Sequence, residues 1–188
     1  VERDFPGVTV GRAIEKMGVW ALPTSELAFA DCFVPDSHRL SRVEGDGEEH
    51  LKKTLAEIRI ITGAMALGVS RAALDEATRY AGERQQFGKP INRFQAIQSK
   101  LAEMATDHEA AVHLVRYAAW CRDSGAPHHK EAAMAKLFAT EMCTQVCERA
   151  LHLCGAHGHM RESAAQRFYR DCKVLEIGAG SGYQAAIL

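Results

Sequence analysis

Apolar residues recur every three or four positions along three long stretches of this chain, from about residue 47 onward. That spacing places them on one face of a helix. The pattern predicts long helices over residues 47–82, 94–123 and 130–153, and a short one over 163–169. Because short connections make successive helices antiparallel neighbours, we expect an up-and-down bundle.

The N-terminal part of the chain has a different pattern. Valine, leucine and phenylalanine alternate there with small or polar residues, and glycines and prolines interrupt the runs. This alternation predicts strands within residues 8–35. A polar, glycine-bearing joint follows at residues 43–49. We therefore expect a mainly α chain, with a short β-rich remnant at 1–45 and a four-helix-type bundle at 46–188.

The last fifteen residues, VLEIGAGSGYQAAIL, raise an alternative. They read as a strand at 174–177, a glycine turn and a helix that starts at Gly182, which resembles the first motif of an S-adenosylmethionine-dependent methyltransferase. A Rossmann-type half needs further strands beside the first. Only six residues follow Gly182, and the chain before Val174 is helical in pattern. A methyltransferase fragment is therefore disfavoured.

Composition narrows the class of protein. Of 188 residues, 47% are hydrophobic and 25% charged, as in ordinary globular proteins. The net charge of −1 provides no excess of positive charge for binding nucleic acid or an anionic membrane. No apolar run is long enough to span a bilayer. The six cysteines lie mostly in helical patterns, which favours a reducing, cytoplasmic setting. The start lacks an initiator Met and a signal peptide, so we expect a piece of a larger polypeptide.

Five separated motifs together resemble the acyl-CoA dehydrogenase family, in order and over essentially the whole chain. They are EKMG with TSELAFADCFVP, YAGERQQFGKPI, FQAIQ, KEAAMAK and RFYRDCK. The resemblance implies that residues 1–45 end the family's middle β-domain and that 46–188 form its C-terminal helical domain. It also implies FAD bound between subunits, an acyl-CoA substrate, and a homodimer, a homotetramer or a heteromer with a homologous subunit.

The segment RQQFG carries the first candidate cofactor residues. A guanidinium at a helix end, next to an aromatic ring and a glycine, suits a phosphate and a flat ring. The resemblance implies that Arg84 reaches the FAD pyrophosphate of a neighbouring subunit and that Gln86 and Phe87 also lie at the cofactor. Gln95 is a further candidate.

The segment HLCGAHGH matches a family segment that contacts the adenine-side half of FAD. His152 and Gly155 inherit that role, whereas Ala156 replaces a glycine and would hinder close backbone approach. In the last turn, the resemblance places Ser181 at the flavin. The histidines and cysteines of this region could alternatively be metal ligands; these residues are Cys147, His152, Cys154, His157 and His159. Their spacing fits no standard zinc pattern, so we expect no metal.

The catalytic base is missing from both places where relatives carry it. Most relatives have a glutamate at the position of Ala179, and a second group has it at the position of Ile58, beside a substrate-proximal arginine that matches Arg59. Glu57 and Glu176 are the weak replacement candidates. Glu57 is rotated by about 100° from Ile58 on a helix. Since a positioned base contributes on the order of 100- to 10,000-fold, ordinary α,β-dehydrogenation should be crippled.

Three functions remain open at this point. The first is an acyl-CoA dehydrogenase whose catalytic base lies at a different position. The second is a member without a base, such as a silent subunit that pairs with an active partner, or a reductase-type or otherwise divergent enzyme. The third is a structural bundle that has lost FAD.

Overall fold

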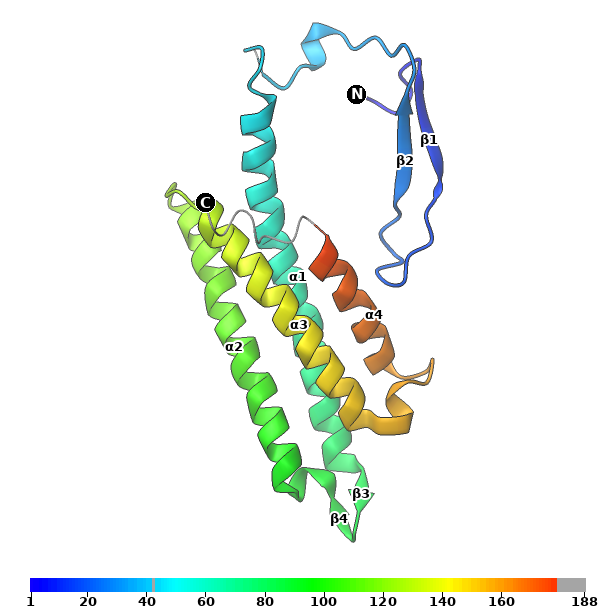
Figure 1. Ribbon diagram of the computed structural model, residues 1–188, viewed down its shortest axis with the longest axis vertical. Coiled ribbons are helices and arrows are strands. Elements are labelled where there is room, and N and C mark those ends of the chain that lie inside the picture. The colour runs from blue at the N-terminus through cyan, green and yellow to red at the C-terminus, as the bar shows by residue number, and fades with distance from the viewer. Residues whose placement is uncertain (42, 179–188) are drawn as a thin grey trace.

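The computed structural model describes residues 1–41 and 43–178, which form four α-helices, two β-hairpins and two short 3-10 helices (Figure 1). In chain order the elements are β1 (Val8–Ala13), β2 (Ser25–Phe29), η1 (Asp36–His38), α1 (Gly47–Glu83), β3 (Gln85–Gln86), β4 (Lys89–Pro90), η2 (Ile91–Arg93), α2 (Gln95–Asp123), α3 (His129–Gly158) and α4 (Ala164–Ile177).

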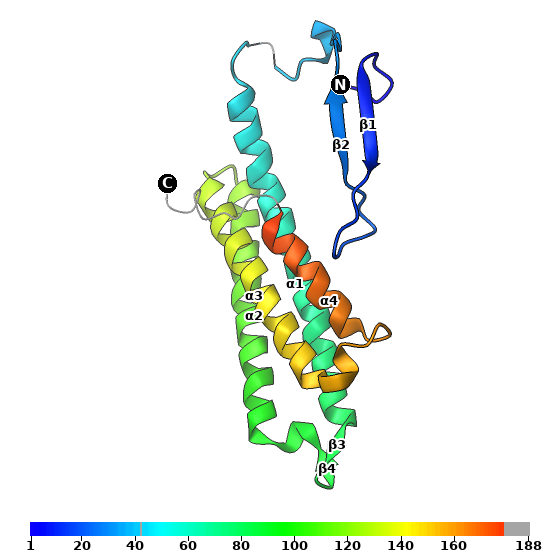
Figure 2. The same cartoon turned by 45° about the vertical axis from the view of Figure 1, so that its right-hand side comes forward.

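The helices α1, α2 and α3 run antiparallel to their chain neighbours, and α4 lies beside α1 and α3 (Figures 1 and 2). This confirms the predicted mainly α bundle and its three long helices. The third helix runs five residues beyond its predicted end, across a non-helical residue at Gly155. Within the described residues, no helix is both long and apolar enough to cross a membrane.

The centre of the bundle is α3, which contacts the other three α-helices. Fourteen of its 30 residues are buried, compared with six of the 29 in α2. Most buried residues of α1 are alanine, glycine, serine or threonine, and such small side chains let helix backbones approach closely. One such close approach is at Gly63, where a Cβ would lie 3.0 Å from Val115 Cγ2 and 3.6 Å from the carbonyl oxygen of Ala135.

The predicted strand at residues 174–177 is wrong, because these residues continue α4. The helix starts at Ser163, whose hydroxyl caps it by accepting from the backbone N–H of Ala165 at 3.3 Å. Its buried residues Cys172 and Leu175 are three positions apart and face the core. Packing of this stripe therefore overrides the strand-like composition of VLEI. The predicted helix from Gly182 lies outside the described residues.

The β1–β2 hairpin is held against α4. Arg170 of α4 donates from Nη1 to the carbonyl of Met17 at 2.7 Å and lies over the Trp20 ring, 4.4 Å from its centroid. Asp171 accepts from the backbone N–H of Val19 at 2.7 Å. Strands cover only part of the predicted 8–35 range, because glycine- and proline-containing turns occupy the rest. The division of the chain at residue 45 remains a prediction.

Candidate active site and cofactor site

A tight hairpin between α1 and α2 carries the RQQFG motif. Strands β3 and β4 pair antiparallel, and the two turn residues, Phe87 and Gly88, have φ of 52° and 75°. Two positive φ values are what a two-residue type I′ turn requires, but a phenylalanine seldom adopts this conformation. Phe87 is also 92% exposed. A strained, exposed aromatic side chain makes this tip a candidate contact site.

Arg84 is the C-cap of α1, and backbone hydrogen bonds on both sides fix its position. Its N–H donates to the Tyr80 carbonyl at 2.8 Å, and its carbonyl accepts from the N–H of Ile91 at 2.9 Å. Its side chain is exposed and makes no ion pair or hydrogen bond with the described residues. The guanidinium is therefore available for an external anion such as a phosphate.

The end of α3 lies across from this hairpin. At Gly155 the chain has φ 55° and ψ −137°, which ends the regular helix, and no atom lies within 4 Å of the place where a Cβ would stand. A groove of about 360 Å³ separates the two segments. The residues lining this groove, called the hairpin groove below, are Tyr80, Arg84, Gln86, Ile91, Leu153, Cys154, Gly155, Ala156 and His157.

The structure brings some of the candidate cofactor residues together and leaves others apart. Arg84, Gln86 and Gly155 share the hairpin groove, whereas Gln95 and His152 are exposed and outside its lining. Phe87 lies at the tip of the hairpin, with its ring edge-on to Phe94 at 6.2 Å. Ser181 lies outside the described residues.

Sequence reasoning did not assign Tyr80 and His157 to the cofactor site. The two rings are stacked, 5.8 Å apart with planes 5° from parallel, and both line the hairpin groove. They lie 77 positions apart in the sequence, so no local pattern could reveal the contact. The only signal was that each belongs to a motif of its own, YAGERQQFG and HLCGAHGH.

At the other end of α1, the position of the alternative base is apolar. Ile58 is 40% exposed, so a larger polar side chain would fit there without entering the core. Its neighbour Glu57 lies 3.4 Å from Arg122 Nη2 of α2. Glu57 therefore faces α2, whereas Arg59, two positions along the same helix, is electrostatically coupled to Lys136 of α3.

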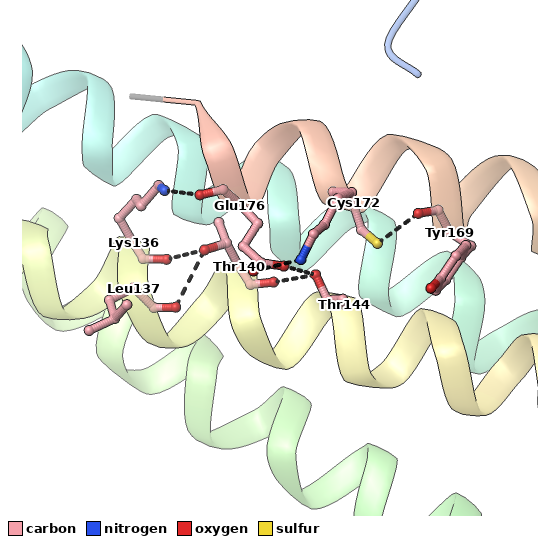
Figure 3. Close-up of polar contacts among 8 residues, drawn as sticks. Lys136, Leu137, Thr140, Thr144, Tyr169, Cys172 and Glu176 are labelled. Carbon is pink, nitrogen blue, oxygen red and sulfur yellow. Dashed lines mark hydrogen bonds and ion pairs between the residues drawn. The ribbon is translucent and has the colours of Figure 1, made fainter. Parts of the chain in front are cut away.

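Glu176 is fully engaged by its neighbours on α3 and α4 (Figure 3). Its carboxylate accepts from Thr144 Oγ1 at 2.6 Å and pairs with Lys173 Nζ at 2.9 Å. Burial opposes ionisation of the carboxyl, but the hydrogen bond from Thr144 and the pair with Lys173 together lower the pKa of Glu176 below its usual value. A carboxylate with a lowered pKa and two partners is a poor general base.

Two cationic side chains, Lys136 and Arg59, lie near the end of α4, beside the carboxylate of Glu176. The completely buried Lys136 donates from Nζ to the Glu176 carbonyl at 2.6 Å. Burial lowers the pKa of Lys136, and the nearby charge of Arg59 adds to this, while the carboxylates of Glu176 and Glu141 partly oppose the shift. The Nε atom of Arg59 is buried and has no partner among the described residues. This region is suited to an anionic group supplied from outside.

The alternative metal site receives no support from the geometry. Across residues 1–41 and 43–178, no three His, Cys, Asp or Glu side chains are placed to hold one ion. Cys147 is buried beside Cys143, with 4.0 Å between the sulfur atoms, while His152 and His159 are exposed.

Comparisons with curated proteins give relatives over nearly the whole chain. Benzylmalonyl-CoA dehydrogenase of Aromatoleum aromaticum is 68% identical over 181 residues, which cover 96% of this chain and 48% of the relative. Acryloyl-CoA reductase (NADH) of Anaerotignum propionicum is 42% identical, with 96% of this chain and 46% of the relative covered. The chain thus spans about half the length of the curated relatives it matches.

Solved structures agree with the sequence comparisons. Butyryl-CoA dehydrogenase from Megasphaera elsdenii superposes with a TM-score of 0.96 and 37% identity, over 100% of this chain and 49% of that one. The protein-family model described as "Acyl-CoA dehydrogenase, C-terminal domain" matches residues 45–184. The chain belongs to the acyl-CoA dehydrogenase family.

Proposed function

We propose that the full-length protein is an FAD-dependent oxidoreductase that forms a Cα=Cβ bond in an acyl-CoA thioester. Family membership supports the reaction class, and the hairpin groove supports the cofactor. Arg84 would hold the FAD pyrophosphate, Gln86 would donate to it, and the positive-φ backbone at Gly155 would let the dinucleotide approach closely. When bound, FAD supplies the two-electron acceptor for the hydrogen that leaves Cβ.

The placement of the two sites supports an oligomer. Arg84 and Arg59 are 25 residues apart on the continuous helix α1, roughly 37 Å along its axis. One flavin dinucleotide is shorter than this, so the two ends of α1 serve different cofactor molecules. Each active site would then combine two subunits, as homodimers, homotetramers or heteromers with a homologous subunit. The six free thiols favour a reducing, cytoplasmic setting.

The substrate we propose carries a carboxyl group on Cα, as the benzylmalonyl group named in the 68% identical relative does. The observation that carries this proposal is that none of the four candidate base positions offers a suitably placed carboxylate: Ile58 and Ala179 are apolar, Glu57 faces Arg122 of α2, and Glu176 is held by its neighbours. An α-carboxylate removes the need for a base, because loss of CO₂ leaves on Cα the electron pair that proton removal would otherwise provide.

The reaction then balances without a protein base. The bond between Cα and the carboxylate breaks, CO₂ leaves, and its electron pair becomes the Cα=Cβ bond, while the Cβ hydrogen leaves with its own pair. The positive charge of Arg59 favours the anionic substrate, and Ile58 offers the departing carboxylate an apolar wall instead of a stabilising partner.

Product identity tests this proposal. Full-length protein with benzylmalonyl-CoA should release one CO₂ for each flavin reduced and form cinnamoyl-CoA that keeps the original Cα hydrogen in D₂O. Formation of benzylidenemalonyl-CoA, with the carboxyl group retained, would mean that a base removes the α-proton and would refute the base-free reaction. Turnover that requires a homologous partner subunit would identify the chain as a silent subunit. A purified full-length protein that contains no flavin would instead be a structural bundle.

Arg84→Ala in the full-length protein should lower FAD affinity about ten- to a hundredfold, because a charge-assisted bond to phosphate contributes about 1.5–3 kcal/mol. The melting temperature of the flavin-free protein should stay nearly constant, since the Arg84 side chain has no partner among the described residues. Flavin content after purification gives the measurement. Arg116→Ala, an exposed arginine on α2, is the matched control; equal flavin content in the two variants would reject the assignment.

Glu57→Gln should leave the rate with benzylmalonyl-CoA within about twofold of wild type, because the surface pair with Arg122 contributes little and is not part of the chemistry. Steady-state kinetics of the full-length protein provide the check. A loss of 100-fold or more would instead make Glu57 the displaced base.

A further inference from the structure

The last turn of α4 has little apolar packing to hold it in place. Leu175 is the last buried residue of this helix, and Ile177 is 71% exposed. The N–H of Gly178 donates to the carbonyl of Val174 at 2.9 Å, which completes the turn. Apolar packing alone therefore does not fix this end of α4 against its neighbours.

Polar contacts from α3 hold this turn instead, and they meet at Glu176 (Figure 3). Lys136 Nζ donates to the backbone carbonyl of Glu176 at 2.6 Å, and Thr144 Oγ1 donates to its carboxylate at 2.6 Å. Lys136 and Thr144 are eight positions apart on α3, about two turns, so they lie on the same side of that helix. We call these two residues the α3 clamp. The clamp holds one residue of α4 by both its backbone and its side chain.

The clamp supplies what α4 cannot supply itself. The last four carbonyls of a helix have no donor within the helix, and a donor from a neighbouring element satisfies them. Lys136 provides such a donor from a completely buried position. The contact of Lys173 with Glu176 lies within α4, so it cannot set where the helix end lies relative to α3. The clamp therefore determines the position of this helix end.

The position of the helix end matters because the chain leads directly from it to Ala179. Gly178 is the C-cap of α4, and the resemblance places the base of most family members at the next position. Arg59, the substrate-proximal candidate on α1, is electrostatically coupled to Lys136, so the clamp also adjoins the candidate substrate site. A displacement of about 1 Å caused by a distant change can lower a reaction rate about 100-fold.

We propose that Lys136 and Thr144 are positioning residues for the reaction, because they act through Glu176 to fix the end of α4 from which the turn at Ala179 begins. This role rests on the proposed function, and it makes Glu176 part of the support of the site and not its base. Thr140 lies between the two residues on α3. Among the described residues its hydroxyl bonds only to carbonyls of α3 itself, those of Lys136 and Leu137, so Thr140 is no part of the clamp.

The test combines anaerobic flavin reduction by benzylmalonyl-CoA with hydrogen exchange of the Gly178 amide, both in the flavin-loaded, full-length protein. Thr144→Val keeps the shape of the side chain and removes the hydroxyl. Flavin reduction at saturating substrate should become about 10- to 100-fold slower, while KM stays within about threefold of wild type. Exchange at Gly178 should become about 10- to 100-fold faster, the factor that a hydrogen bond to a charged group contributes.

Three further variants show whether the contact itself is responsible. Lys136→Met should show the same slower reduction and faster exchange, because it removes the other half of the clamp. Thr144→Ser keeps a hydroxyl and should stay close to wild type in both measurements. Thr140→Val is the matched control on the same helix and should also behave like wild type. Equal rates of flavin reduction in Thr144→Val and Thr140→Val would overturn the proposal.

A double variant tests whether Thr144 acts through Glu176. In a Glu176→Met background, Thr144→Val should change the rate of flavin reduction by less than about twofold, since its partner is already absent. A full additional loss would overturn the assignment. A slow Glu176→Met variant together with a wild-type rate in Thr144→Val would overturn it as well, and would make Glu176 the displaced base.

The two readouts separate this proposal from the proposed function. Faster exchange at Gly178 with unchanged flavin reduction would show that the clamp only stabilises α4, which would refute the positioning role and leave the proposed function intact. If benzylmalonyl-CoA does not reduce the flavin of the wild-type protein, the proposed function fails. Exchange at Gly178 would then still support or refute the hold of the clamp on α4.

Discussion

Ala179→Glu should give the full-length protein a new activity, the oxidation of acyl-CoA thioesters that carry no α-carboxyl group. We expect flavin reduction by 3-phenylpropionyl-CoA to rise about 100- to 10,000-fold above wild type, which is the usual contribution of a positioned base. The α-proton of such a thioester is a weak acid, so its removal needs a carboxylate within hydrogen-bond reach. Glu57 faces Arg122 of α2 and Glu176 is held by Thr144 and Lys173, so neither is placed to take that role.

The same variant should lose activity with benzylmalonyl-CoA, because a second carboxylate beside the substrate's own carboxylate is unfavourable. Anaerobic flavin reduction by both thioesters measures this change of specificity. Ala179→Gln has nearly the same shape without the charge and is the matched control. Ile58→Glu tests the second family position, where the 40% exposed side chain leaves room for a carboxylate. If neither glutamate variant oxidises 3-phenylpropionyl-CoA, the missing base is not what limits the wild-type protein.

Residue periodicity predicted the long helices well, since each carries an apolar stripe over seven or more turns. It predicted only the first part of α4, as a short helix over 163–169, because VLEI before a glycine-rich turn has the composition of a buried strand. That segment is too short for its own pattern to decide between helix and strand. The decision comes from Cys172 and Leu175, which pack into a core built by other helices.

The candidate site was predictable only where a sequence motif carried it. RQQFG and the glycine of HLCGAHGH led to Arg84 and Gly155, which the structure brings to one groove. Contacts made in space were not predictable, such as the rings of Tyr80 and His157. The sequence could not predict where the Glu57 side chain points, because this depends on which helix packs against its face of α1. The contact with Arg122 shows that this helix is α2.

Lys136→Ala should lower the free energy of unfolding by about 3–4 kcal/mol, the largest stability effect we expect from a single site. Lys136 is the largest fully buried side chain among the residues that the structure describes. Its removal leaves a cavity about three methylenes long, at about 0.8 kcal/mol each. It also removes a charged donor from the Glu176 carbonyl, one of the last carbonyls of α4, which have no partner within the helix.

Two variants separate packing from charge in urea unfolding of the full-length protein. Lys136→Met keeps most of the volume and should lose only about 1–2 kcal/mol, because it loses the hydrogen bond but also the cost of burying a charge. Lys173→Ala removes the half-exposed partner of the Glu176 carboxylate and should change stability by less than about 1 kcal/mol. Equal effects of Lys136→Ala and Lys173→Ala would show that the buried ammonium does not hold the end of α4.

The pH dependence of stability gives an independent check on Lys136. Its pKa is lowered in the folded protein from an ordinary value of 10.5, chiefly by burial and also by Arg59, against the opposing charges of Glu176 and Glu141. Between the lowered pKa and 10.5 the unfolded chain therefore binds more protons at this residue than the folded chain, so the free energy of unfolding rises with pH across that window. Lys136→Met should remove this rise, whereas Lys173→Ala should keep it, because Lys173 is half-exposed and its bond to Glu176 raises its pKa. A wild-type slope that persists unchanged in Lys136→Met would assign the proton release to another group and would refute the lowered pKa of Lys136.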